Sequence, residues 1–386
     1  MGRPKSENKL PSIDISIVDY IKKMRQLNPG WGPKTIHAEL KNDRRWSSEQ
    51  VPSIRSIAYL LQAAGLSRKY DKRIELKEIQ STNAPTQAHQ RWQLDAQGYV
   101  HLAQLGTIAM INIKDIYSKT YCLAYPNQLK GKYGHSKRVD YQCALRLAFA
   151  EFGLPQELQT DHEAIFYEAK SKSPFPTRFH LWLISLGITK FFSRKGRPQD
   201  QGAVERMHQT IEKQVLQGKT YKTWYELFQA CQERRYFLNN FFPCSTLKDQ
   251  PPFEAFPEAR KKKRDYSIDR EEDYMDLQRV YDYLDTGKWF RNCSRAKTVT
   301  IGGQVYFIKS AQPKGELEIT FEKQDNTLEF KNDKGQIIDR HPIKGIEKRI
   351  LMGQLFYKMS NLQLELPLDW ESKKVSTTFL HNDSMT

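Results

Sequence analysis

The sequence predicts a multidomain α+β protein, and three observations lead to that class. Its 386 residues are more than one hydrophobic core usually organises. The hydrophobic fraction of 39% and the aromatic fraction of 12% supply enough apolar surface to fold without disulfides or metals, which excludes wholesale disorder. The apolar pattern then changes along the chain, from helical, to strands mixed with helices, to short alternating runs.

Residues 10–70 are expected to form a module of three short helices. Apolar residues recur at helical spacing from Ile17 to Met24, and this first helix should end near Pro29. The third helix should begin after Ser53, a possible N-cap. This arrangement predicts a DNA-binding helix-turn-helix, with an all-helical interaction domain as the alternative. The polar residues 71–88 are expected to be a linker.

Residues 89–256 alternate strands and helices in an order that suits an RNase H-like α/β core, a mixed sheet covered by helices. In such a sheet the first and fourth strands are neighbours. The expected elements, in chain order, are strands at 91–95, 107–113 and 120–125, a helix at 136–152, a strand at 157–160, a helix at 179–186, a strand at 189–192, and helices at 199–216 and 224–242.

The last third of the chain is divided by its charge pattern. Residues 257–286 hold five consecutive cations, Arg260 to Arg264, followed by an acidic stretch, which favours a solvated charged linker; a phosphate-gripping arm is the alternative. Short alternating runs between glycine and asparagine turns predict a small antiparallel β-barrel over residues 287–345. Residues 346–386 form a weakly patterned C-terminal tail.

The charge balance points to polyanionic partners. Sixty-one Lys and Arg against 45 Asp and Glu give a net charge of +16, which favours nucleic acid phosphates. No apolar run is long enough for a membrane span, so no membrane association is expected. The 5 scattered cysteines form no C-x-x-C pair, which argues against a zinc site or a disulfide framework and fits reduced thiols in a bacterial cytoplasm or nucleoid.

Three carboxylates occupy positions that favour metal chemistry. Asp95 follows the apolar positions of the first strand, Asp161 follows the fourth strand, and Glu205 lies in the first turns of the long helix. Neighbouring strands would bring the two aspartates to one sheet edge, and the helix would add the glutamate. Clustered anions need counter-charge, and all-oxygen ligation selects Mg²⁺ or Mn²⁺. Two such ions can support in-line displacement at phosphorus.

The long helix should present two different faces. Its apolar stripe comprises Val204, Met207, Ile211 and Val215. Glu205 should therefore point away from the core, and it shares its face with His208, Gln209 and Glu212. For these last three residues, simple solvent exposure is the favoured interpretation.

The sequence resembles DDE integrases and insertion-sequence transposases in three places. Asp95 ends Trp-Gln-Leu-Asp, Asp161 ends Leu-Gln-Thr-Asp, and the stretch from Ser193 to His208 follows the pattern S-x-x-x-x-P-Q-x-x-G-x-V-E-R-x-H. The resemblance implies a retroviral-integrase-like catalytic core, and Asp95, Asp161 and Glu205 as ligands of two Mg²⁺ or Mn²⁺ ions. It implies strand transfer by a DNA 3′-hydroxyl, and a homo-oligomer on double-stranded DNA. The family commonly has Asn-Gly after the second aspartate, where this chain has His162 and Glu163.

Basic residues near these motifs are candidates for DNA contacts. Arg194, Lys195 and Arg197 precede the long helix and could hold the phosphate backbone, with a solvated loop as the alternative. Base selection would then fall to the N-terminal helices, with Arg55 and Lys34 as the candidate residues. The function expected is that of a DNA transposase or integrase. An inactive, transposase-derived DNA-binding regulator and an RNase H or Holliday-junction nuclease are the alternatives.

Overall fold

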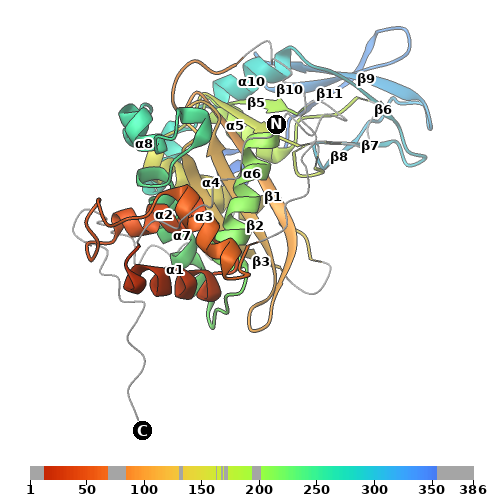
Figure 1. The fold of residues 1–386 in the computed structure, drawn as a ribbon. Helices are drawn as coiled ribbons and strands as arrows, with labels where there is room; N and C mark the ends of the chain where they lie inside the picture. Colours follow the sequence, from red (N-terminus) through yellow and green to blue (C-terminus); the bar gives the residue numbers. More distant parts are fainter. Residues whose placement is uncertain are drawn as a thin grey trace, which may run out of the picture.

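The computed structural model describes residues 13–67, 84–129, 134–161, 163–166, 168, 173–193 and 201–353. Within these ranges the protein is a mixed α/β structure with a mixed sheet and many helices (Figure 1). None of the helices in the described part of the chain has the length and apolar character needed to cross a bilayer. The predicted linker at 71–88 lies mostly outside the described residues.

A five-stranded sheet in the order β3-β2-β1-β4-β5 forms the centre of the molecule. β1 (Arg91–Leu102) pairs antiparallel with β2 (Gly106–Asp115) and parallel with β4 (Glu157–Thr160). β3 (Tyr121–Gln128) pairs antiparallel with β2, and β5 (Thr189–Phe192) pairs parallel with β4. The predicted contact between the first and fourth strands is confirmed.

Helices cover both faces of this sheet. The first face packs against α4 (Arg138–Phe152) and α5 (Arg178–Ser185), and the second packs against α6 (Gly202–Ile211), the π-helix η2 (Glu212–Leu216) and α7 (Trp224–Asn240). Figure 1 shows α6, in green, lying against the strands β1 and β2, with which it makes its sheet contacts. The predicted long helix is therefore an α-helix, α6, that continues into the π-helix η2. The residues of its predicted apolar stripe are all buried.

Alternation along β1 separates its core residues from its polar residues. Trp92 and Leu94 join the core on the side of α4, where Trp92 packs 5.8 Å from Phe149 between ring centroids. The intervening Gln93 faces the other side, because its Oε1 accepts a hydrogen bond from the Val204 amide of α6 at 3.1 Å. Asp95 follows on that same side and also contacts α6.

The three N-terminal helices form as predicted. They are α1 (Ile15–Leu27), α2 (Pro33–Asn42) and α3 (Ile54–Ala63), and they share a small core of their own. The Ser53 hydroxyl caps α3 by accepting a bond from the Ser56 amide at 3.1 Å, which confirms the predicted N-cap. A DNA-reading role for these helices stays a prediction.

The N-terminal helices pack on η2 and α7. The Trp31 indole donates to the Gln214 carbonyl oxygen at 3.3 Å, and Glu39 forms an ion pair with Arg234 at 2.7 Å. Gly30 lies so close to η2 that an added Cβ would stand 1.6 Å from the Lys213 carbonyl oxygen. A residue without a side chain is therefore required at this contact.

Residues 257–286, which we expected to be a solvated linker, fold onto the core instead. After the short elements η3 (Ser245–Leu247) and α8 (Pro252–Ala255), they form η4 (Pro257–Arg260), η5 (Ile268–Arg270), α9 (Glu271–Tyr274) and α10 (Leu277–Asp285). The cations from Arg260 to Lys263 are exposed, as the linker prediction requires. The physical reason for the difference lies in the acidic part, where Glu271 is buried.

The Glu271 carboxylate accepts four hydrogen bonds inside the core. Arg146 donates from Nε at 2.5 Å and from Nη2 at 2.7 Å, the Trp182 indole donates at 2.8 Å, and the Tyr266 hydroxyl at 2.5 Å. The side chains of both ion-pair partners are almost fully buried, at 1% and 0% exposure. This network fixes α9 to α4 and α5, so the segment is anchored to the core through Glu271, while Asp265, Asp269, Glu272, Asp273 and Asp276 stay exposed.

The C-terminal strands form two separate sheets. The four-stranded sheet has the order β11-β10-β9-β6, and the strands β7 and β8 form a hairpin. The hydrogen bonding does not show the single small barrel that we expected. The strands are β6 (Lys288–Asn292), β7 (Thr298–Ile301), β8 (Gln304–Phe307), β9 (Glu316–Glu322), β10 (Thr327–Lys331) and β11 (Ile337–Pro342).

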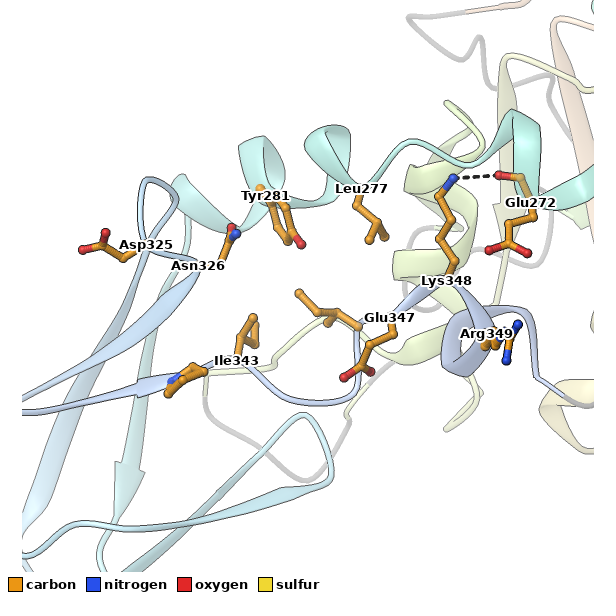
Figure 2. Close-up of a pocket in the computed structure, with 11 residues that line it drawn as sticks. Glu272, Leu277, Tyr281, Asp325, Asn326, Ile343, Glu347, Lys348 and Arg349 are labelled. Carbon is orange, nitrogen blue, oxygen red and sulfur yellow. Dashed lines mark hydrogen bonds between the residues drawn. The ribbon is translucent and has the colours of Figure 1, made fainter.

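An open pocket of about 450 Å³ lies where α10 meets the four-stranded sheet (Figure 2). Leu277 and Tyr281 of α10 line one side, and Ile343 lines the other. The short helix α11 (Lys348–Met352) closes this region, where the Lys348 ammonium donates to the Glu272 carbonyl oxygen at 2.8 Å. The start of the predicted tail is therefore packed, and residues 354–386 lie outside the described part of the chain.

Candidate functional site

Asp95 and Asp161 lie at the same edge of the central sheet. The parallel ladder between β1 and β4 ends with Gln93 opposite Gln159; Asp95 comes two residues later on β1, and Asp161 comes two residues later, directly after β4. Neighbouring strands are about 4.8 Å apart, so this register brings the two positions next to each other. Both side chains are partly exposed, as ligands for an ion from solution must be.

The His208 imidazole of α6 contacts the Asp95 carboxylate. Its Nε2 lies 3.1 Å from Asp95 Oδ2, and its Nδ1 lies 2.7 Å from Nδ2 of Asn112. Asn112 sits directly across from Asp95 in the β1–β2 ladder, so the imidazole spans a cross-strand pair. The favoured expectation of solvent exposure is wrong for His208, which is 7% exposed, because these two polar groups give it partners inside the fold.

Glu205 lies on α6, one turn before His208. It follows Val204, whose amide is bonded to Gln93 of β1, and it precedes His208 by three residues, so it lies on the same side of the helix as His208. Its side chain is partly exposed. Gln209 and Glu212 are exposed, as expected, and Glu212 Oε2 accepts a bond from Gln97 at 3.3 Å.

A further carboxylate, Glu163, stands at the site. The Tyr141 hydroxyl of α4 donates to Glu163 Oε2 at 2.6 Å, and the Glu163 amide donates to Asp161 Oδ1 at 3.0 Å. Burial raises the pKa of Glu163, the Tyr141 bond opposes that rise, and the Asp161 and Asp95 carboxylates add to it. Burial also raises the pKa of Tyr141, and the same three carboxylates add to that rise. Three acidic groups therefore act on one another here.

The donor atoms at this edge suit a hard dication. Asp95, Asp161 and Glu205 offer carboxylate oxygens, and Asp95 Oδ1 has no partner among the described residues. Within those residues, no three acidic, histidine or cysteine side chains stand close enough together to hold an ion by themselves. Mg²⁺ is usually bound by one or two carboxylates together with waters and substrate phosphates, so the aspartate pair fits such an ion.

The candidate DNA contacts fall into two groups. Arg194, Lys195 and Arg197 lie outside the described residues, as does His162. Arg55 is exposed at the start of α3. Lys34 forms an exposed ion pair with Asp249 at 2.6 Å, so a phosphate at this position would compete with that carboxylate.

The sequence prediction missed two residues of this site. Asn112 lies in an apolar strand, and Tyr141 lies in a helix where every neighbouring residue is buried. Neither belongs to a motif. A polar side chain within the otherwise apolar run from Ile108 to Ile113 was the only signal that could have drawn attention to Asn112.

No family model matches the sequence. Solved structures that are similar include the integrase catalytic core domain of HTLV-2 in complex with magnesium, at 16% identity and a TM-score of 0.32, covering 44% of this chain and 96% of that one. A simian T-cell lymphotropic virus intasome in complex with a PP2A regulatory subunit has 14% identity and a TM-score of 0.36, covering 84% and 96%. The BIV integrase catalytic core has 18% identity and a TM-score of 0.31, covering 45% and 96%. These values are too low to assign the chain an activity.

Proposed function

We propose that this protein is a polynucleotidyl transferase of the DDE type, a transposase or integrase that cleaves DNA strands and joins them to a target. The observation that supports the proposal is the β1–β4 ladder, which leads to Asp95 and Asp161 at one sheet edge, together with the contact of α6 with Asp95 through His208, three residues after Glu205. Asp95, Asp161 and Glu205 are the acidic residues of the three sequence motifs, and they are far apart in the chain.

In this proposal, Asp95, Asp161 and Glu205 would hold two Mg²⁺ or Mn²⁺ ions together with waters and DNA phosphates, because no three such side chains among the described residues stand close enough to hold an ion by themselves. When bound, such ions acidify a coordinated water or hydroxyl and stabilise the charge on the leaving oxygen. The carboxylates of Asp95, Asp161 and Glu205 would orient the ions at the open edge of the sheet. Double-stranded DNA would reach this edge from solvent, since the aspartates are partly exposed.

The net charge of +16 supports DNA as the substrate. In this proposal the N-terminal helices bind the element ends and the C-terminal sheets add nonspecific contacts. Assembly as a homo-oligomer on DNA is part of the same proposal, and light scattering on end DNA would test it, since a lone monomer on the DNA would refute it.

A joining assay tests the activity. We expect the purified protein to nick supercoiled DNA or join an end oligonucleotide with Mg²⁺ or Mn²⁺ and to lose that activity in chelator. Asp95→Asn, Asp161→Asn and Glu205→Gln should each abolish joining while DNA binding persists. Binding that is equally strong in chelator, with no joining under any metal condition, would instead identify a DNA-binding regulator.

A further inference from the structure

The structure points to His208 and Asn112 as a positioning pair for Asp95. We infer that His208, held by Asn112, fixes the Asp95 carboxylate so that its second oxygen would be available to bind an ion. This inference rests on the proposed function, because it concerns the same metal site.

The first step of the argument is geometric. The His208 imidazole reaches Asp95 Oδ2 through Nε2 at 3.1 Å, and the other oxygen, Oδ1, has no partner among the described residues. One oxygen of the carboxylate is thus anchored to the protein and the other is available. Metal-binding carboxylates are commonly anchored by outer hydrogen bonds in this way.

The second step concerns what holds the imidazole. Asn112 Nδ2 donates to Nδ1 at 2.7 Å, so Nδ1 acts as the acceptor and the proton is on Nε2, from which it is donated to Asp95. Asn112 itself is 0% exposed and is fixed in the β1–β2 ladder opposite Asp95. Both ends of the chain of hydrogen bonds are therefore anchored on neighbouring strands.

The third step distinguishes positioning from ordinary packing. An apolar residue of α6 could fill the space at His208, as Val204 and Met207 do on the buried side of the helix. The Asn112 Oδ1 atom has no hydrogen-bond partner among the described residues. A buried amide whose oxygen has no hydrogen-bond partner lowers stability. The presence of Asn112 is therefore better explained by the contact of its Nδ2 with His208 than by packing.

Mn²⁺ binding to the full-length protein tests the inference, with Mn²⁺ alone as the probe and the electron paramagnetic resonance signal of the free ion as readout. His208→Ala should weaken binding about 10- to 100-fold. His208→Gln should restore most of it, because its amide can donate from nearly the same place as Nε2. Asn112→Leu should weaken binding in the same direction as His208→Ala. Gln209→Ala is the matched control, since Gln209 is exposed on the same helix, and it should leave binding unchanged.

The outcomes separate the inference from the proposed function. No Mn²⁺ binding by the wild type overturns both. Binding that is lost in Asp95→Asn and kept in His208→Ala overturns the positioning role alone. Equal losses in His208→Ala and His208→Gln, with equally lowered melting temperatures, identify His208 as a structural residue and also overturn it. A second readout is ¹⁵N NMR of the His208 ring, which should show the proton on Nε2 in the wild type; a proton on Nδ1 instead refutes the hydrogen-bond chain.

Discussion

Replacing Arg146 should lower the free energy of unfolding by much more than the loss of an exposed ion pair would. Glu271 is 1% exposed as a residue, and Arg146 provides two of its four hydrogen bonds and its counter-charge. Arg146→Met would leave a carboxylate in the core with only the Trp182 and Tyr266 donors. Breaking a buried pair on one side usually costs about 3–5 kcal/mol. We expect a loss of that size in the free energy of unfolding, measured by urea denaturation.

A neighbouring ion pair provides the control. Arg270 and Asp273 lie in the same segment, 3.0 Å apart, but their side chains are 67% and 62% exposed. Arg270→Met should therefore leave the urea midpoint nearly unchanged, because an exposed pair is screened by water. The double variant Arg146→Met with Glu271→Met should recover much of the loss, since it leaves no unpaired charge. A loss below about 1 kcal/mol in Arg146→Met would refute the conclusion that the 257–286 segment is held in the core by this pair.

Three other predictions follow from the structure. Burial lowers the pKa of Lys190 to about 7, so the folded protein holds this proton less tightly than the unfolded chain does. The free energy of unfolding should therefore rise with pH between about 7 and 10, relative to that of Lys190→Met, by at most about 1.4 kcal/mol per pH unit. Parallel pH profiles of unfolding for the two proteins would contradict this. Gly30→Ala should release the N-terminal helices from η2 and speed amide hydrogen exchange at Lys213. Gly32→Ala should not, because nothing lies within 4 Å of the added Cβ. Equal exchange rates in the two variants would exclude the contact between Gly30 and Lys213. Arg55→Ala should lower the affinity for the element-end sequence more than the affinity for unrelated DNA, and equal losses on the two sequences would remove Arg55 from base selection.

The secondary structure was predictable wherever local patterns decide it. The spacing from Ile17 to Met24 and the Ser53 cap mark α1 and α3 because periodicity and capping are local properties. β1 extends to Leu102, well beyond the predicted strand, because its second half pairs with β2 in a hairpin and has exposed residues on it. Pairing with a partner strand, and not apolar alternation, decides where this strand ends.

The 257–286 segment shows why composition fails for tertiary contacts. A run of cations followed by acids is typical of a solvated linker, and the exposed cations agree with that interpretation. The burial of Glu271 depends on Arg146 of α4 and the Trp182 indole of α5, which are far away in the sequence, and on the Tyr266 phenol in the loop before η5. No local pattern contains that information, because it arises only when α4, α5 and α9 meet.

Only part of the candidate site could be predicted from the sequence. Asp95, Asp161 and Glu205 could be named from motifs and strand ends, and their roles as metal ligands stay a prediction. The environment of His208 could not be named, because helical periodicity gives only the side of the helix on which a residue lies. It does not show that the side-chain amide of Asn112, on β2, lies within hydrogen-bonding distance of the His208 ring.

The path from the N-terminal helices to the candidate site runs along one continuous helix. His208 of α6 contacts Asp95, and the following π-helix η2 contacts Trp31 and Gly30 through the carbonyl groups of Gln214 and Lys213. Six residues of helix separate the two contacts, a rise of roughly 9 Å, and the π-helical part is a place where helices commonly bend. If the N-terminal helices move at η2, we expect the displacement to be absorbed either by the π-helix η2, where the hydrogen bonding departs from the α-helical pattern, or by α6 at the Asp95 contact. Hydrogen exchange in Gly30→Ala distinguishes these, because faster exchange confined to η2 assigns the movement to the π-helix, whereas faster exchange reaching His208 assigns it to the helix that holds the site.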